Sequence, residues 1–116
     1  RGHNFAVVNN TIAQDKRLIC IDTNHMDAVS NFAIPIIGND GNAAKIFKNK
    51  FEKSGIEIRP MIAGNMSRQP FFKKYCHGSL FPKNSEFIHL NGMYFGNHPE
   101  LNNDDLDFIV EVLRTA

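Results

Sequence analysis

Apolar residues near the amino terminus recur at the spacing of a helix. Phe5, Val8 and Ile12 fall three and four positions apart, and Ala13 follows, so the pattern predicts a helix there. The next apolar run, at residues 18–21, is compatible with a short strand or with a segment that lies on a neighbouring element.

A first strand is predicted just after residue 31. Phe32, Ile34 and Ile36 alternate with other residues, and the turn-forming residues 38–41 end the run. Pro35 lies inside it. Because proline has no N–H to donate to a neighbouring strand, the pattern favours an edge position or a bulge.

An amphipathic helix and a second strand are predicted next. Ala43, Phe47 and Phe51 are four residues apart, with lysines between them. Gly55 is suited to end this helix in the left-handed conformation. Apolar and polar residues alternate again at 56–59, which predicts the strand.

The last quarter of the chain predicts one more strand and one more helix. Residues 92–96 form the strand, whereas residues 87–90 fit a helical turn or a strand. Asn102 and Asp105 have the spacing of a capping box. The apolar stripe of the helix that follows is Leu106, Ile109, Val110 and Leu113. Together these elements predict an α+β fold, a small sheet of about three strands backed by helices.

Composition is typical of a soluble, cytoplasmic globular protein. The 116 residues suit a single modest core, and 42% are hydrophobic and 22% charged. Residues 32–37, the longest apolar run, are too few to cross a bilayer, and no leader pattern is recognised. Thirteen basic and twelve acidic residues nearly cancel, so we expect neither nucleic acid nor membrane as a partner. Cys20 and Cys76 do not form a secreted disulfide framework and are expected to be buried or half-buried.

Standard catalytic and metal-binding motifs do not occur in the sequence. There is no glycine-rich phosphate loop, no His-Glu-x-x-His, no Gly-x-Ser-x-Gly and no Cys-x-x-Cys. The five histidines, which form no i, i+4 pair, are His3, His25, His77, His89 and His98. We therefore expect no metal site.

A polar loop after the second predicted strand is the first candidate binding segment. It passes Gly64, where backbone can approach a ligand closely, and then offers Asn65, Ser67, Arg68 and Gln69. Guanidinium and amide groups suit phosphate or sugar hydroxyls. The residues alone favour a simpler interpretation, a polar turn whose Asn and Ser satisfy their own backbone.

Asn97 and His98 form the second candidate, between the third strand and the last helix. They could orient a substrate or a partner subunit, although the residues alone favour a helix entry stiffened by Pro99. Arg59 is either a substrate ligand or, as we prefer, a structural ion-pair partner. The aromatic cluster of Phe71, Phe72 and Tyr75 is predicted to pack in the core.

Several segments follow one another in the order and spacing of a known enzyme family. They are Gly55-Ile56-Glu57-Ile58-Arg59-Pro60, Ala63-Gly64-Asn65, Arg68-Gln69-Pro70-Phe71-Phe72, and Asn91 to Pro99 with Leu101 and the Asp104-Asp105-Leu106 helix start. Residues 31–116 thereby resemble the C-terminal small domain of the sugar aminotransferase family (DegT/DnrJ/StrS type), whose members are fold-type I pyridoxal phosphate enzymes. Residues 1–30 match only loosely.

The polar loop departs from the usual aminotransferase pattern, which has Pro-Leu-His before Gln-Pro. Ala63-Gly64-Asn65, with Arg68 before Gln69-Pro70, looks like the family's 3-dehydratase branch. That branch uses pyridoxamine phosphate to remove the 3-hydroxyl of a nucleotide-linked keto sugar, with a His where aminotransferases keep a Schiff-base Lys. The resemblance thus implies deoxysugar synthesis, for example for the O-antigen of lipopolysaccharide or another surface polysaccharide.

The resemblance also implies which parts of the enzyme lie elsewhere. Pyridoxal or pyridoxamine 5′-phosphate would be bound by a large N-terminal domain, and no catalytic or cofactor-binding residue is matched in this chain. The full-length enzyme would be a homodimer whose small domain closes over the substrate. Asn65, Ser67 and Arg68 would then contact the nucleotide-linked keto-deoxysugar, with Asn97 and His98 as second choices.

The expected organisation is a helix and connector at residues 1–30, followed by the small domain at 31–116. The chain opens on Arg1 without an initiator Met, which suggests a piece of a longer protein or a trimmed chain. Two alternatives remain open, the same domain of a nucleotide-sugar aminotransferase and a free-standing, non-catalytic binding module. We expect the isolated chain to be inactive and to expose an apolar patch where the large domain docks.

Overall fold

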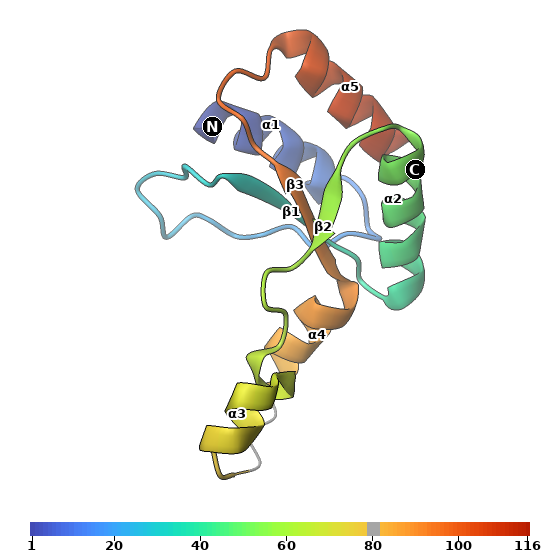
Figure 1. The fold of residues 1–116 in the computed structure, drawn as a ribbon. Coiled ribbons are helices and arrows are strands. Elements are labelled where there is room, and N and C mark those ends of the chain that lie inside the picture. Colours follow the sequence, from blue (N-terminus) through green and yellow to red (C-terminus); the bar gives the residue numbers. More distant parts are fainter. Residues whose placement is uncertain (79–81) are drawn as a thin grey trace.

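The computed structural model describes residues 1–78 and 82–116, and Figure 1 shows how they are arranged around a three-stranded sheet. In chain order the elements are α1 (Gly2–Ala13), β1 (Ala33–Ile37), α2 (Gly41–Lys53), β2 (Ile58–Pro60), the short 3-10 helix η1 (Met66–Arg68), α3 (Pro70–Tyr75), α4 (Lys83–Asn91), β3 (Gly92–Gly96) and α5 (Asn103–Arg114). The predicted α+β class is confirmed. Residues 87–90, which fitted either a helix or a strand, are helical.

The strands are antiparallel and lie in the order β1-β3-β2, so the last strand in sequence is the central one. Ile34 of β1 and Ile58 of β2 both lie opposite Phe95 of β3. Each outer strand contains a proline, Pro35 in β1 and Pro60 in β2. A proline is tolerated at an edge because its missing N–H faces no partner strand, and the predicted edge position of Pro35 is confirmed.

One face of the sheet is covered by helices and forms the core. Strand alternation directs Ile34, Ile36, Met93 and Phe95 to this face, and all four are buried. α1 and α2 pack on the strands, and α5 packs across both helices. The ring centroids of Phe51 and Phe95 are 5.4 Å apart. Since each such side chain contributes about 1.5–3 kcal/mol on burial, this layer holds the domain together.

The predicted amino-terminal helix is α1, and its apolar side belongs to the same core. Phe5, Val8 and Ile12 are buried there, and the helix packs against α5. The segment that follows runs along the end of β1, where Leu18 forms an isolated bridge with Gly38. Residues 18–21 are therefore a segment that lies on a neighbouring element, one of the two possibilities that the pattern left open.

The predicted signals at Gly55 and at Asn102 with Asp105 are confirmed, and Asp40 provides a further cap. The Asp40 carboxylate accepts the Ala43 N–H at 2.7 Å and caps α2. Asn102 and Asp105 cap each other's backbone N–H groups in a reciprocal capping box at the start of α5. Gly55, just beyond α2, has the left-handed φ of +75°. Each side-chain cap is worth about 1 kcal/mol, so α2 and α5 start where their sequences direct.

The apolar stripe of α5 differs from the prediction at one position. Leu106, Ile109 and Leu113 are buried as expected, but the fourth buried residue is Val112, and Val110 is partly exposed. The side of α5 that faces α1 and α2 is centred near Ile109. Because successive residues turn by about 100° around a helix, this rotation brings Val112 inward and turns Val110 toward solvent.

Several side chains predicted to be buried are exposed. Phe71 and Tyr75 are 49% and 70% exposed, and Phe72 is half-buried, so the prediction that this cluster packs in the core is wrong. α3 has only six residues and contacts η1, on an arm that extends away from the sheet (Figure 1). Cys20, in the connector, and Cys76, at the end of α3, are likewise exposed.

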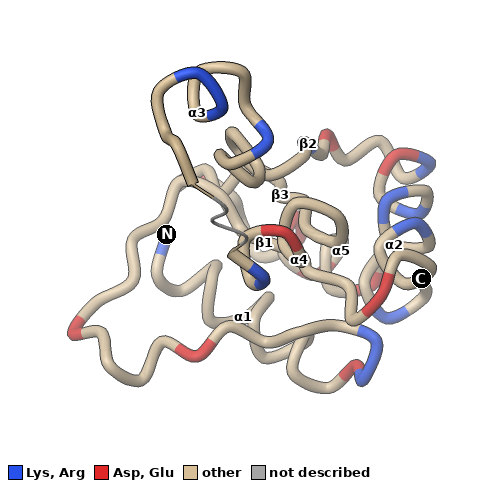
Figure 2. The backbone as a smooth tube through the Cα atoms, turned by 90° about the horizontal axis from the view of Figure 1, so that it is seen from below, with Lys and Arg blue, Asp and Glu red and all other residues tan. Residues whose placement is uncertain are grey.

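Charges are spread over the molecule without one dominant patch. Figure 2 shows basic and acidic positions on several elements, with lysines in the last turns of α2 and α3. Within the two described ranges, no helix has the length and apolar character needed to cross a membrane.

Candidate functional site

The polar loop at residues 61–69 lies against α4 because of the way the sheet is connected. Pro60, the last residue of β2, lies opposite Met93 of β3. The chain therefore leaves β2 at the end of the sheet where α4 runs into Gly92. We call the loop, η1, α3 and α4 together the arm (residues 61–78 and 82–91). In the arm, residues of the loop contact residues of α4 that lie about 20 positions later in the sequence.

Asn65 is the centre of the polar contacts in the arm. Its side chain is fully buried, and its Nδ2 donates to Glu86 Oε2 at 2.6 Å. Its Oδ1 accepts the Ser67 backbone N–H at 3.0 Å and the Ser67 hydroxyl at 2.8 Å. Its own N–H donates to His89 Nδ1 at 3.0 Å. Asn65 thus caps η1, as the simpler interpretation held, and also joins the loop to α4.

Arg68 forms a two-pronged ion pair with Glu86. Arg68 Nε donates to Glu86 Oε2 at 2.9 Å, and Nη2 donates to Oε1. The hydrogen bond from Arg68, and after it the one from Asn65, lowers the pKa of Glu86, while the carboxylate raises the pKa of Arg68. Both groups are therefore charged at neutral pH. Guanidinium and carboxylate match in planar geometry, which fixes the orientation of the arginine.

The backbone before Asn65 is held in an uncommon conformation. Ala63 and Gly64 have φ of 59° and 53°, and the left-handed region costs a non-glycine residue about 1–2 kcal/mol. A Cβ on Gly64 would lie 2.0 Å from His89 Nδ1. The close approach expected at Gly64 is thus made by the His89 ring. Strain of this kind is often found at binding sites, which supports the loop as a candidate site.

A cavity of about 530 Å³ lies on the face of the sheet opposite the helical core. Pro35 and Tyr94 form its floor, and the Phe32 ring packs edge-on against Tyr94 at 6.4 Å between centroids. One wall consists of Gly64, Ser85 and Ile88. These residues directly precede Asn65, Glu86 and His89 in the sequence. The arm thus contributes to a largely apolar cavity through Gly64, Ser85 and Ile88, whereas Asn65, Arg68 and Glu86 do not line it.

The second predicted loop lies at the opposite end of β3. Asn97 is buried, and its Nδ2 donates to the carbonyl oxygens of Arg1 at 3.2 Å and Asn31 at 3.0 Å. Its Oδ1 accepts from Asn4 Nδ2 at 3.2 Å. His98 is exposed, and its Nδ1 accepts a backbone N–H from the following turn. The contacts of Asn97 join α1 to the sheet, and the geometry adds no support for its predicted substrate role.

The five predicted substrate residues therefore separate into two groups. Asn65, Ser67 and Arg68 lie together in the arm, whereas Asn97 and His98 lie beyond the other end of the central strand. Arg59 donates through Nε to Glu57 at 3.0 Å, which gives it the ion-pair partner that we preferred. A substrate role for Arg59 stays a prediction.

Sequence reasoning missed Glu86 and His89, the two α4 residues that hold the loop. They are three positions apart, which places them on one side of a helix. The apolar residues around them, Phe87, Ile88 and Leu90, left helix and strand equally open, so this shared side was not visible. If residues 83–91 had been assigned to a helix, Glu86 and His89 would have been placed on the same side of it.

Comparison with known proteins agrees with this fold. No protein-family model matches the chain. The fold is similar to one segment of a sugar dehydratase whose structure was solved with bound PLP. The chain is 29% identical over 85 residues to GDP-4-keto-6-deoxy-D-mannose 3-dehydratase of Escherichia coli O55:H7 (strain CB9615 / EPEC), a match covering 72% of this chain and 22% of that protein.

A solved structure gives the same relationship. The E. coli GDP-4-keto-6-deoxy-D-mannose-3-dehydratase with bound hydrated PLP superposes with a TM-score of 0.76 at 23% identity, over 96% of this chain and 29% of that one. The chain thus spans less than a third of the length of either relative. The predicted resemblance to the 3-dehydratase branch is confirmed, and the fold is that of a fragment of such an enzyme.

Proposed function

We propose that this chain is the small C-terminal domain of a pyridoxamine-phosphate-dependent nucleotide-sugar 3-dehydratase, and that its arm forms one wall of the substrate site. The observation that carries the proposal is the group of Asn65, Ser67, Arg68 and Glu86, joined by hydrogen bonds beside an apolar cavity, in a chain similar to such a dehydratase. Arg68, half exposed, would contact the substrate, and Asn65 would hold the loop in shape.

The cofactor would be bound outside this chain. The cavity on the open sheet face is lined by no lysine, arginine or histidine side chain, whereas the phosphate of pyridoxal 5′-phosphate calls for cationic or clustered N–H donors. The lining of this cavity therefore does not fit the cofactor by itself. What the residues of this chain can do is bind and orient the sugar and exclude water from one side of the site.

The open face of the sheet would receive the large domain. Phe32 and Ile62, which line the cavity there, are 62% and 65% exposed, and a cluster of large apolar side chains of this kind commonly marks an interface. The isolated chain would then be inactive, and the full-length enzyme would be a cytoplasmic homodimer in deoxysugar synthesis.

The test is an assay of the full-length protein that carries this chain. With pyridoxamine 5′-phosphate and GDP-4-keto-6-deoxy-D-mannose, we expect NMR to detect methylene protons at sugar C3, because the 3-hydroxyl is removed. An amino sugar in place of this product would assign the enzyme to the aminotransferases. The upstream residue aligned with the Schiff-base position gives an independent answer: His supports the dehydratase and Lys the aminotransferase.

A further inference from the structure

The Arg68–Glu86 ion pair limits what the arm can recognise, an inference that rests on the proposed function. Glu86 occupies Nε and one N–H of Nη2. Within the described ranges no protein acceptor takes the remaining N–H groups, so up to three donors of the five on a guanidinium face outward. The Arg68 side chain is 51% exposed, while that of Glu86 is 11% exposed. The carboxylate thus holds the arginine from its inner side.

The charge of the pair favours a neutral ligand. A diphosphate gains most from a cation whose charge is not already balanced, because charge-assisted hydrogen bonds and Coulomb attraction act together. Here the carboxylate is bound to the guanidinium and would repel a second anion. A hydroxyl or carbonyl oxygen needs only the donors, which remain available and fixed in direction.

The arm also fixes the position of this pair. Asn65 binds the same Glu86 oxygen as Arg68 Nε, and its backbone N–H binds His89 on the next turn of α4. Glu86 is therefore held by donors from two residues of the loop, and any displacement of the carboxylate would change the direction of the Arg68 donors. Such an arrangement suits recognition by geometry.

We propose that Glu86 is a positioning residue that orients and neutralises Arg68. Arg68 then binds a hydroxyl or carbonyl oxygen of the sugar, and not the diphosphate of the nucleotide sugar. Arg68 makes the contact, and Glu86 acts through it.

The experiment compares sugar binding with nucleotide binding in the full-length enzyme. For Arg68→Ala we expect the KM for GDP-4-keto-6-deoxy-D-mannose to rise roughly tenfold, the effect of losing one or two hydrogen bonds. The inhibition constant of GDP, which carries the diphosphate without the sugar, should stay within about twofold of wild type. A parallel rise of both constants would overturn the proposal, because Arg68 would then hold the diphosphate. Lys73→Ala, which removes a positive charge from the same arm, is the control and should change neither constant.

A second set of variants tests whether Glu86 acts through Arg68. Glu86→Gln should raise the KM for the nucleotide sugar, and GDP should bind equally well or more tightly because Arg68 is no longer neutralised. The double variant Arg68→Ala/Glu86→Gln should be no worse than Arg68→Ala alone, as expected for residues that act as a unit. Additive losses would assign Glu86 a separate, purely structural role and overturn the proposal.

The two proposals can fail separately. If the wild-type enzyme does not convert the nucleotide sugar, the proposed function falls and this inference falls with it. If the enzyme is active but Arg68→Ala leaves the KM unchanged, this inference and the proposed contact of Arg68 with the substrate are overturned, while the dehydratase assignment stands.

Discussion

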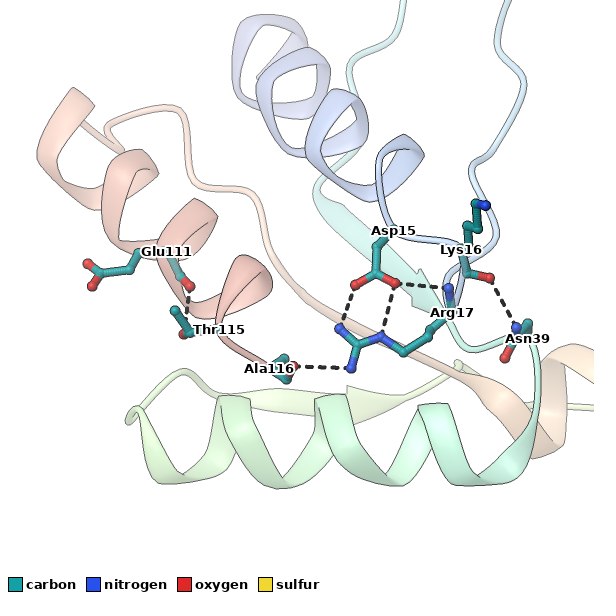
Figure 3. Close-up of polar contacts among 7 residues, drawn as sticks. All are labelled: Asp15, Lys16, Arg17, Asn39, Glu111, Thr115 and Ala116. Atoms are coloured by element: carbon teal, nitrogen blue, oxygen red, sulfur yellow. Dashed lines mark hydrogen bonds and ion pairs between the residues drawn. The ribbon is translucent and has the colours of Figure 1, made fainter.

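The guanidinium carbon of Arg17 lies 4.9 Å from the centre of the Phe47 ring, directly over a fully buried side chain of α2. Figure 3 shows the polar contacts of the same arginine, which pairs with Asp15 through Nε and Nη2 and donates through Nη1 to the carbonyl oxygen of Ala116 at 3.1 Å. One side chain thus ties the connector after α1 to α2 and to the end of α5.

Replacing Arg17 should therefore loosen the connector. We expect Arg17→Ala to lower the free energy of unfolding by about 1–2 kcal/mol, from the lost cation–π contact and hydrogen bonds. Arg17→Lys should lie in between, because it keeps the charge but not the forked geometry. Urea unfolding of the 116-residue chain followed by circular dichroism measures this. Lys45→Ala, an exposed charge change on α2, should have little effect, and an equal loss there would refute the interpretation.

The helical core should be sensitive at Phe51. This ring is fully buried and packs on Phe95, so Phe51→Ala should cost about 3–5 kcal/mol through lost burial and the cavity left behind. Phe108 of α5 is 47% exposed, and Phe108→Ala should change stability by no more than about 0.5 kcal/mol. Comparable losses for the two variants in urea unfolding would contradict the assignment of the core.

Alanine substitutions at Gly64 and Gly55 distinguish a steric clash from backbone strain. Both have positive φ, but a Cβ on Gly55 would meet nothing within 4 Å, whereas on Gly64 it would collide with His89. Gly55→Ala should cost about 1 kcal/mol. Gly64→Ala should cost more and should also displace His89 from the Asn65 N–H. NMR of the His89 imidazole checks the displacement, and an unchanged spectrum in Gly64→Ala would refute it.

Acid should weaken the arm through Glu86. Its pKa in the folded protein lies below the ordinary value of 4.5 because Arg68 and Asn65 donate to the carboxylate. The resulting stabilisation is fully present above the unfolded value and is lost as the pH falls through the folded value. Carbon NMR of the Glu86 carboxyl should show this lowered pKa, and in Arg68→Ala it should move up toward 4.5.

Stability measurements provide the complementary check. Glu86→Gln should make unfolding less dependent on pH below about 4.5, because the group that binds the proton is gone. Asp15 also has a lowered pKa, owing first to its hydrogen bond from Arg17. Asp15→Asn is therefore the matched variant, because it removes a carboxylate of the same kind outside the arm. If Glu86→Gln keeps the full acid sensitivity of the wild type, the carboxylate does not stabilise the fold.

Local signals in the sequence predicted the elements well, and distant contacts accounted for the errors. Gly55 and Asn102 act on neighbouring backbone, so these helix ends could be predicted from a few residues. The pairing of Arg68 with Glu86 spans 18 positions and depends on how β2 feeds the loop onto α4. The exposure of Phe71 has a similar origin, because helical spacing alone does not reveal whether another element covers the helix.

Pro35 and Pro60 have a consequence for how this molecule meets other chains. They occupy the two outer strands, so the row of donors that an approaching strand would need is broken on both rims of the sheet. Growth of the sheet by strand addition, the usual route to β-aggregation, is disfavoured on either side. A partner such as the proposed large domain would then bind through side chains, where shape and chemistry can select one surface over another, and not by adding a strand.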